Sequence, residues 1–257
     1  MDQDQALDAF IAYTNAYDAA NPRIALKVEH TLRVASLCRR IATELGLPQH
    51  EIELAWLVGL LHDIGRFEQV RRYNTFNDAA SVSHAALGTQ LLFESSDGRE
   101  PLIRTFCTDD ANDELIRIAI AHHSDYQVPA ELDQRTRLFC DLLRDADKID
   151  IIKVNVICPI EDIYGVSEAD MRASALSPAC VDLFYQHRCL PRDVRQYPAD
   201  IMLGHICFAW ELVFPQSLAI AREQGHVRTM LSRTWDQPQT QAAFDAMAAH
   251  MQEALGL

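Results

Sequence analysis

The chain has 257 residues, of which 49% are hydrophobic and 23% are charged, values typical of soluble globular domains. Its 23 basic and 37 acidic residues give a formal net charge of −14, which disfavours non-specific binding to nucleic acid or to anionic lipid. The longest apolar run, Leu54 to Leu61, is far shorter than the roughly 20 residues of a transmembrane helix. We therefore expect a soluble, folded chain without a nucleic-acid or membrane partner.

The seven cysteines stand singly along the chain, without a Cys-x-x-Cys pair. This odd number and this spacing suit neither a disulfide framework nor a zinc finger. No signal-peptide pattern precedes them. We expect reduced thiols in a cytoplasmic protein.

The fold class follows from apolar residues that recur at spacings of three and four through most of the chain, a pattern that predicts an all-α protein. The segment 151–158 is the one β-like exception. Asn21 and Pro22 resemble an N-cap followed by the first residue of a helix. That helix is expected to end at Gly46.

A second helix is expected from about Gln49, and its segment 54–61 is apolar on every face, which indicates a core helix. This helix ends in the pair His62-Asp63, so two strongly polar groups terminate the most buried helix of the chain. Residues 67–82 are polar and basic without a clear period, and they are interpreted as a loop.

The remainder of the chain alternates helical segments with turn-forming residues. A helix is expected over 84–93, followed by an irregular stretch over 95–111. Later helices are expected over 113–124, 131–150 and 238–255. Proline interrupts the pattern at Pro178, Pro191, Pro198 and Pro215. We place a soft domain boundary at 157–160.

Seven potential metal ligands lie at or near the ends of the expected helices: His30, His62, Asp63, His84, His122, His123 and Asp147. Imidazole and carboxylate suit divalent Fe, Mn, Ni or Zn, and in helical domains such ligands converge from separate helices. Burying several of these groups without a cation would cost several kcal/mol each. The other histidines are interpreted as ordinary surface or core residues: His50, His187, His205, His226 and His250.

The order of these residues and their contexts, LLHDIGR at 60–66 and DADKID at 145–150, resemble the HD-domain superfamily of metal-dependent phosphohydrolases. Within the second context, Asp147 is the residue that matches the metal-binding aspartate of the family. The resemblance covers about residues 25–157. It implies an HD-domain helical bundle. With the soft boundary given above, we expect an all-α HD domain with an N-terminal helix over 1–158 and a helical C-terminal extension over 159–257.

The additional histidines resemble the His-rich branch of the superfamily, whose members hold two or sometimes three metals. The resemblance implies bound divalent ions of Fe, Mn, Ni, Zn or Mg, and we expect two of them. It assigns the first ion to His30, His62, Asp63 and Asp147. It assigns the second to His84 with one or both of His122 and His123, and Asp63 bridges the two. The Gly-Tyr-Pro signature of HD-GYP cyclic-dinucleotide phosphodiesterases does not follow His123, which argues against cyclic di-GMP as substrate.

The activity that the resemblance implies is hydrolysis of a phosphomonoester or phosphodiester by a metal-activated hydroxide. The expected substrate is a nucleotide or a related small phosphorylated metabolite. Catalytic roles are expected for Asp63, Arg66 and Lys148. Guanidinium groups match the geometry of phosphate, so substrate binding is expected of Arg66, Arg71 and Arg72. Tyr73, next to Arg72, is also expected to bind substrate. Arg71 and Arg72 fit an exposed loop equally well.

Two further functions stay open on the sequence: a di-iron oxygenase of the same superfamily, and a catalytically silent metal-binding module. Residues 160–257 carry none of the family motifs. They could extend the helical shell, cover the site or form a homodimer interface.

Overall fold

The computed structural model describes residues 2–95, 98 and 100–257, and over these residues the chain forms helices and loops without a strand. The all-α prediction is confirmed for this part of the chain. The β-like segment 151–158 lies in or directly after a long helix, because Ile149 and Ile152 are buried at helical spacing and this packing overrides the local β preference. The chain divides into two compact units, residues 1–147 and residues 148–257.

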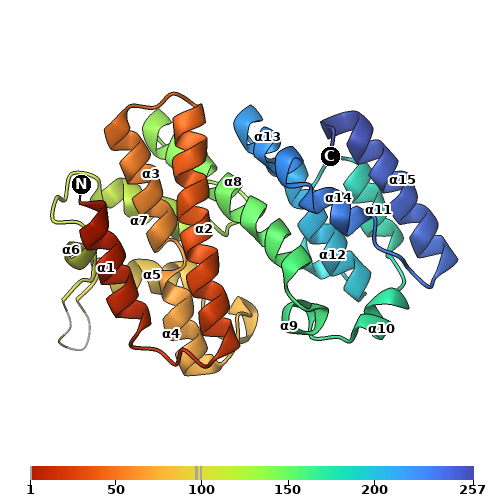
Figure 1. The fold of residues 1–257 in the computed structure, drawn as a ribbon, viewed down its shortest axis with the longest axis horizontal. Coiled ribbons are helices and arrows are strands. Elements are labelled where there is room, and N and C mark those ends of the chain that lie inside the picture. The colour runs from red at the N-terminus through yellow and green to blue at the C-terminus, as the bar shows by residue number, and fades with distance from the viewer. Residues whose placement is uncertain (1, 96–97, 99) are drawn as a thin grey trace. The chain divides into compact units, whose positions relative to one another are not determined.

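The first unit contains the helices drawn from red to yellow-green in Figure 1. Their bounds are α1 Gln3–Thr14, α2 Pro22–Glu44, α3 Gln49–Leu61, α4 Ile64–Tyr73, η1 Asp78–Ala80, α5 His84–Phe93, α6 Ile103–Phe106 and α7 Asp113–His122. Helix α8, Gln134–Ile157, begins in the first unit and ends in the second, so the division lies inside a helix. The sequence had suggested a boundary at the end of this helix.

Helices α2 and α3 pack along each other and form the centre of the first unit. The Asn21 side chain accepts a hydrogen bond from the backbone N–H of Arg23, which fixes the start of α2. A Cβ atom at Gly59 would lie 2.8 Å from the Cα atom of Ala35, so glycine permits the close approach of the two helices. Every residue from 54 to 61 is buried, as the apolar run predicts.

Helix α4 replaces the first half of the loop that the sequence predicts over 67–82. The prediction was wrong because Glu68 and Gln69 are buried and paired, so the polar residues hide the helical period. Asn74 caps the end of this helix with a left-handed backbone, at a φ angle of 50°. A Cβ atom at Gly65 would lie 2.2 Å from the backbone oxygen of His84, so this glycine lets α4 meet α5.

The helices expected over 84–93 and 238–255 are confirmed with their predicted bounds. Helix α7 ends two residues before the predicted 113–124, and α8 starts and ends later than the predicted 131–150. The stretch predicted to be irregular, 95–111, contains the short helix α6. Residues 96, 97 and 99 of that stretch lie outside the described residues.

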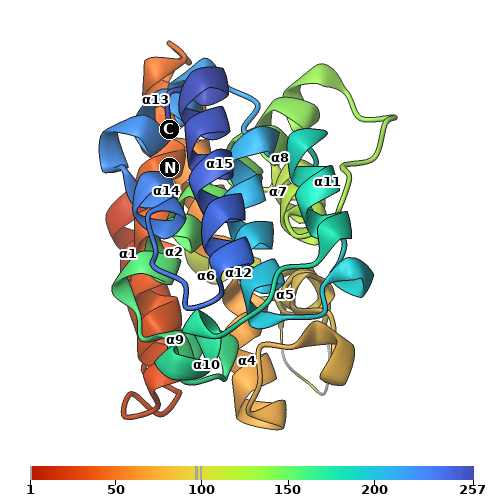
Figure 2. The same ribbon diagram turned by 90° about the vertical axis from the view of Figure 1, so that its right-hand side faces the viewer.

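The second unit is a separate helical body, and its last helix, α15, is drawn in dark blue in Figure 2. The bounds are α9 Ile160–Tyr164, α10 Glu168–Arg172, α11 Pro178–Tyr185, η2 Arg192–Val194, α12 Pro198–Ile206, η3 Cys207–Glu211, α13 Pro215–Gln224, α14 His226–Leu231 and α15 Pro238–Leu255. Three of the prolines that were expected to interrupt helices instead occupy first helical positions: Pro178, Pro198 and Pro215. Phe184, Phe244 and Met247 are fully buried in its core.

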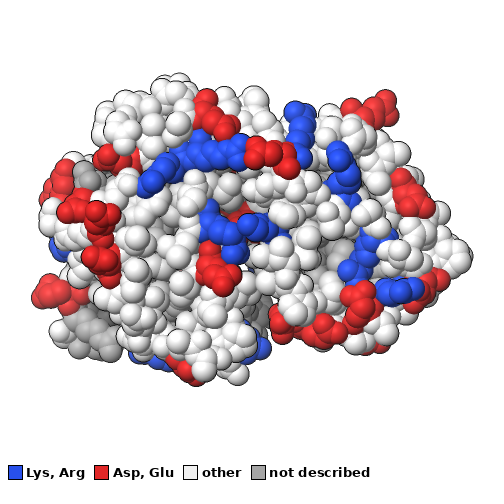
Figure 3. Space-filling view, viewed as in Figure 1, with Lys and Arg blue, Asp and Glu red and all other residues white. Residues whose placement is uncertain are grey.

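Charged side chains are interspersed on the face drawn in Figure 3, where basic and acidic groups lie among a larger area of other residues. None of the helices formed by the described residues combines the length and the hydrophobicity needed to cross a membrane.

Candidate metal centre

Six buried side chains of the first unit converge, and three overlapping sets of three offer ligand atoms within 4.8 Å of one another. Together they form two groups that share Asp63. The six residues are His30, His62, Asp63, His84, His123 and Asp147. His30 and Asp147 project from the middle of α2 and α8. The others stand where helices begin or end: after α3, before α4, at the start of α5 and after α7. The sequence named all six as metal ligands.

The first group is built around the Nε2 atoms of His30 and His62, which lie 3.3 Å apart. The Oδ1 atom of Asp147 is 3.1 Å from His30 Nε2 and 3.7 Å from His62 Nε2. The Oδ2 atom of Asp63 is 3.5 Å from each of these two nitrogens. Two imidazoles and two carboxylates thus enclose one small volume.

The second group joins the Nε2 atoms of His84 and His123, which are 3.0 Å apart. The other oxygen of Asp63, Oδ1, is 3.5 Å from His84 Nε2 and 3.7 Å from His123 Nε2. Asp63 therefore turns one oxygen to each group. This is the arrangement of a carboxylate that can bridge two cations.

The tautomers of three of the rings follow from the atoms that face Nδ1. For each ring an acceptor oxygen lies within 2.7 Å of Nδ1: the Gly59 carbonyl for His62, the Asp78 carboxylate for His84 and the Ile120 carbonyl for His123. We assign the ring proton to Nδ1 on this ground, which leaves a lone pair on Nε2 in the neutral ring.

The donor set therefore fits a bound cation. When both rings are neutral, the Nε2 lone pairs of His84 and His123 face each other across 3.0 Å, next to a carboxylate. Burial lowers the pKa of His84 to about 4, although Asp78 acts in the opposite direction, so this ring is neutral at pH 7. Acceptors that face acceptors in a buried site repel one another, and a divalent cation removes the repulsion.

The two carboxylates of the centre are ionised at neutral pH. Burial raises the pKa of Asp63, but the positive charge of Lys27 acts against it, and the pKa lies well below its ordinary value. Burial also raises the pKa of Asp147, whereas the hydrogen bond with His30 and the neighbouring imidazoles together bring it below its ordinary value. Ionised carboxylates and neutral imidazoles are the protonation states that metal binding needs.

Two cationic side chains approach Asp63 from outside the groups. The Lys27 ammonium lies 2.5 Å from Asp63 Oδ2, and Arg66 Nε lies 3.6 Å from Asp63 Oδ1. The ring of Phe76 lies under both cations, at 5.4 Å from Lys27 and 5.6 Å from Arg66. The sequence named Arg66 but not Lys27. Lys27 lies one helical turn before His30 and therefore on the same side of α2, and this spacing is a signal in the sequence that indicates Lys27.

Asp78 supports the centre without belonging to it. Its Oδ2 atom is 2.6 Å from His84 Nδ1, and its Oδ1 atom accepts hydrogen bonds from Arg66 and Gln69, each at 2.8 Å. A carboxylate on the outer nitrogen of a metal-binding histidine fixes the orientation of the ring. No local pattern in the sequence indicates Asp78, because the segment after α4 approaches His84 only in the folded chain.

Arg144 joins the two helices that carry His123 and Asp147. It is buried, and its guanidinium donates to the carbonyl oxygens of His122, His123 and Asp125 at 3.1, 3.2 and 2.5 Å. The final carbonyls of a helix have no partner within that helix. Arg144 supplies a hydrogen-bond donor to these carbonyls at the end of α7. It lies one helical turn before Asp147 on α8.

His122 does not reach the metal groups and is a correction to the predicted ligand set. Its side chain is 32% exposed, and its Nδ1 atom lies 2.7 Å from the Asp125 carboxylate. Adjacent residues of a helix point about 100° apart, so only one of His122 and His123 faces the interior.

The predicted substrate-binding arginines beyond Arg66 have local partners. Arg71 and Arg72 both pair with the buried carboxylate of Glu68, at 2.6 Å for Arg71, and both are about half exposed. Tyr73 is exposed at the end of the same helix. The ammonium of Lys148, predicted to be catalytic, lies 2.7 Å from Glu211 in the second unit.

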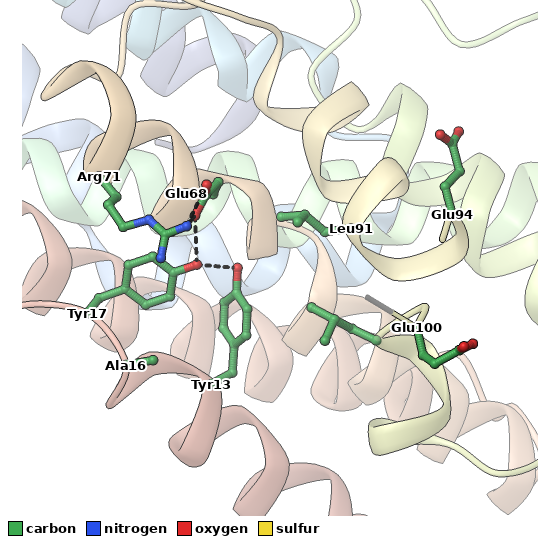
Figure 4. Close-up of a pocket in the computed structure, with 9 residues that line it drawn as sticks. Tyr13, Ala16, Tyr17, Glu68, Arg71, Leu91, Glu94 and Glu100 are labelled. Carbon is green, nitrogen blue, oxygen red and sulfur yellow. Dashed lines mark hydrogen bonds and ion pairs between the residues drawn. The ribbon is translucent and has the colours of Figure 1, made fainter. Parts of the chain in front are cut away.

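A cavity of about 290 Å³ lies elsewhere in the first unit, and none of the six converging residues lines it. Figure 4 shows Tyr17 pointing to Glu68 and to Tyr13 within it. The Tyr13 hydroxyl donates to the backbone oxygen of Ile64, the residue after Asp63, at 3.2 Å. This aromatic side of the cavity holds the start of α4 in place. Phe67, considered from the sequence as part of a loop, is buried against these rings.

Comparison with known proteins gives one match. The family model described as "HD domain" matches residues 28–152, a segment that contains all six converging side chains. Comparisons with curated proteins and with solved structures give no match. Over residues 28–152 the chain matches the HD domain, a family made up largely of metal-dependent phosphohydrolases.

Proposed function

We propose that the protein is a metal-dependent phosphohydrolase that cleaves a phosphomonoester or phosphodiester of a nucleotide or a related small metabolite. The observation that carries the proposal is Asp63, which turns one oxygen to the pair His30 and His62 and the other to the pair His84 and His123. Two neighbouring divalent cations held in this way would supply Lewis acidity and would lower the pKa of a bound water molecule.

The first ion would be held by His30, His62 and Asp147, and the second by His84 and His123, with Asp63 shared. The ligands are buried and the carboxylates of Asp63 and Asp147 are ionised, so little rearrangement is needed on binding. Asp78 keeps the Nε2 atom of His84 directed inward by holding its Nδ1 proton.

Arg66 and Lys27 would bind the phosphate group. Arg66 uses Nη1 for Asp78 and Gln69, whereas its Nε atom is buried and has no hydrogen-bond partner among the described residues. An N–H group in this position can donate to a phosphate oxygen next to Asp63. The Phe76 ring beside both cations offers an apolar surface to the rest of the substrate.

The proposal is tested by preparing the full chain without oxygen, measuring its metal content and then screening nucleotides and phosphorylated metabolites for phosphate release. We expect release that a chelator abolishes and that added metal restores. Asp63→Asn should be inactive. Asp125→Asn is the matched control, because Asp125 is half exposed beside His122, and it should remain active.

Two results would contradict the proposal. A metal-loaded chain that hydrolyses no phosphate ester in the screen would support the silent metal-binding module. Oxygen consumption with substrate, together with an iron paramagnetic signal and no phosphate release, would support the di-iron oxygenase.

A further inference from the structure

A second pair of histidines meets in the second unit, outside the residues that match the HD domain. The Nε2 atoms of His187 and His250 lie 2.9 Å apart, although the two residues are 63 positions apart in the chain. Taken from the sequence alone, each is an ordinary surface or core residue. The structure brings them together from the end of α11 and from α15.

The backbone at His187 has an unusual conformation for this residue type. His187 follows α11 with a φ angle of 56°. Its N–H donates to the Phe184 oxygen, and the N–H of Arg188 donates to the Leu183 oxygen. This is the helix-ending motif in which the left-handed position is most often glycine. A histidine there accepts a conformational cost that glycine avoids, and its imidazole is directed toward α15.

Both rings are held by aromatic neighbours. The His187 ring stacks on Trp210 with centroids 3.9 Å apart and planes inclined by 12°. The His250 ring packs against Tyr185 at 5.1 Å and against Phe184 at 6.0 Å, in both cases at a steep angle. The two nitrogens are therefore positioned before any ligand arrives, which reduces the entropy lost on binding.

We propose that His187 and His250 chelate one late transition-metal ion, of the class of Cu²⁺, Ni²⁺ or Zn²⁺. Two imidazole nitrogens bound to one ion at about 2.0–2.1 Å stand roughly 2.9–3.4 Å apart for bond angles between a right angle and the tetrahedral value. The observed separation of 2.9 Å falls in this range. His187 is exposed, so solvent can fill the remaining coordination positions.

The donor set separates this site from the centre in the first unit. Two imidazoles without a carboxylate favour Cu²⁺ over Zn²⁺ and give little affinity for Mg²⁺ or Mn²⁺. An ion bound here would tie the end of α11 to α15. It would raise the stability of the folded chain by mass action, because the unfolded chain does not hold the pair together.

The test uses the full chain and Cu²⁺ as the probe, and compares the wild type with His187→Asn and His250→Gln. Asparagine tolerates the left-handed conformation, so His187→Asn should fold. The control is His50→Gln, because His50 is 75% exposed on α3. We expect the wild type and the control to bind one Cu²⁺ more than either variant. Its electron paramagnetic resonance spectrum should show two nitrogen ligands.

Losing one of the two ligands should weaken this Cu²⁺ at least about tenfold. The thermal midpoint without metal should be similar in all four proteins, whereas its rise with Cu²⁺ should be smaller in the two variants. If Cu²⁺ stoichiometry, spectrum and thermal shift are the same in the wild type and in a folded variant, the pair is only a hydrogen-bonded contact between two rings and the proposal is wrong. The two variants lie on different elements, so misfolding of one leaves the other to decide.

Discussion

Each unit buries an aspartate side chain, but the aspartate of the second unit is surrounded by hydrogen-bond donors and that of the first unit faces acceptors. In the second unit, Asp200 is fully buried and accepts four hydrogen bonds. The donors are the N–H and the hydroxyl of Ser177 at 2.8 and 2.6 Å, the N–H of Gln196 at 2.8 Å and the N–H of Tyr197 at 3.0 Å. Donors surround this carboxylate, so it needs no cation.

Asp63 in the first unit is equally buried but faces Nε2 atoms that carry lone pairs in the assigned tautomers. Lys27 offsets only part of this excess of acceptors. The comparison teaches that burial alone does not mark a metal ligand. The balance of donors and acceptors around the carboxylate separates a structural aspartate from a metal-binding one.

Exchanging the carboxylates for amides tests this comparison most strongly. Asp63→Asn should abolish metal binding at both groups, because Asp63 is the only ligand that the two groups share through separate oxygens. Elemental analysis of the folded variant measures the effect. A variant that keeps two ions per chain would show that Asp63 does not bridge them.

Asp200→Asn should have the reverse outcome. It weakens charged hydrogen bonds at a buried site, which should cost on the order of 3 kcal/mol of unfolding free energy. Metal content should stay at the wild-type level. Denaturant unfolding and elemental analysis on the same sample give both values, and loss of metal with unchanged stability would reverse the assignment.

Asp78→Asn should have a smaller effect on the metal centre. An amide cannot hold the Nδ1 proton of His84 as a carboxylate does, so metal affinity should fall about 10- to 100-fold. A competition titration with a chelator measures this change. Asp109→Asn is a suitable control, because Asp109 is exposed. Equal metal affinity in Asp78→Asn and in the control would show that Asp78 does not support metal binding through His84.

The smallest predicted effect is the pH response of His205 in the second unit. Burial lowers the pKa of His205 to about 3, and Arg195 and Arg192 act in the same direction. The unfolded chain takes up this proton near pH 6.5 and the folded chain only near pH 3, so acidification through this window favours unfolding.

Between pH 6.5 and 4 the wild type should therefore lose about 1 kcal/mol or more of stability relative to His205→Gln. Denaturant midpoints at several pH values test this difference. Parallel pH profiles for the two proteins would show that His205 is protonated as easily in the folded chain as in the unfolded chain.

The sequence predicts the centre better than it predicts the surroundings of the centre. His62 and Asp63 end an apolar helix, and the pattern around Asp147 is distinctive, so local context was enough for these ligands. His122 and His123 could not be separated, because the choice depends on which side of α7 faces α5.

Supporting residues depend on the tertiary structure. Asp78 and Phe76 come from a loop that returns to α4 and α5, and nothing local in the sequence indicates this return. The missed helix α4 has the same cause, because Glu68 is buried by partners rather than by apolar character. Likewise, the contact of His187 with His250 joins two helices whose adjacency the sequence does not encode in any motif.

The most direct test of the central claim is a crystal structure of the full chain soaked in Mn²⁺, with the ions located by anomalous scattering. The account predicts one anomalous peak beside the Nε2 atoms of His30 and His62 and another beside those of His84 and His123. Both should contact Asp63. Peaks only at other positions, or a centre without anomalous signal while ions bind elsewhere, would contradict it.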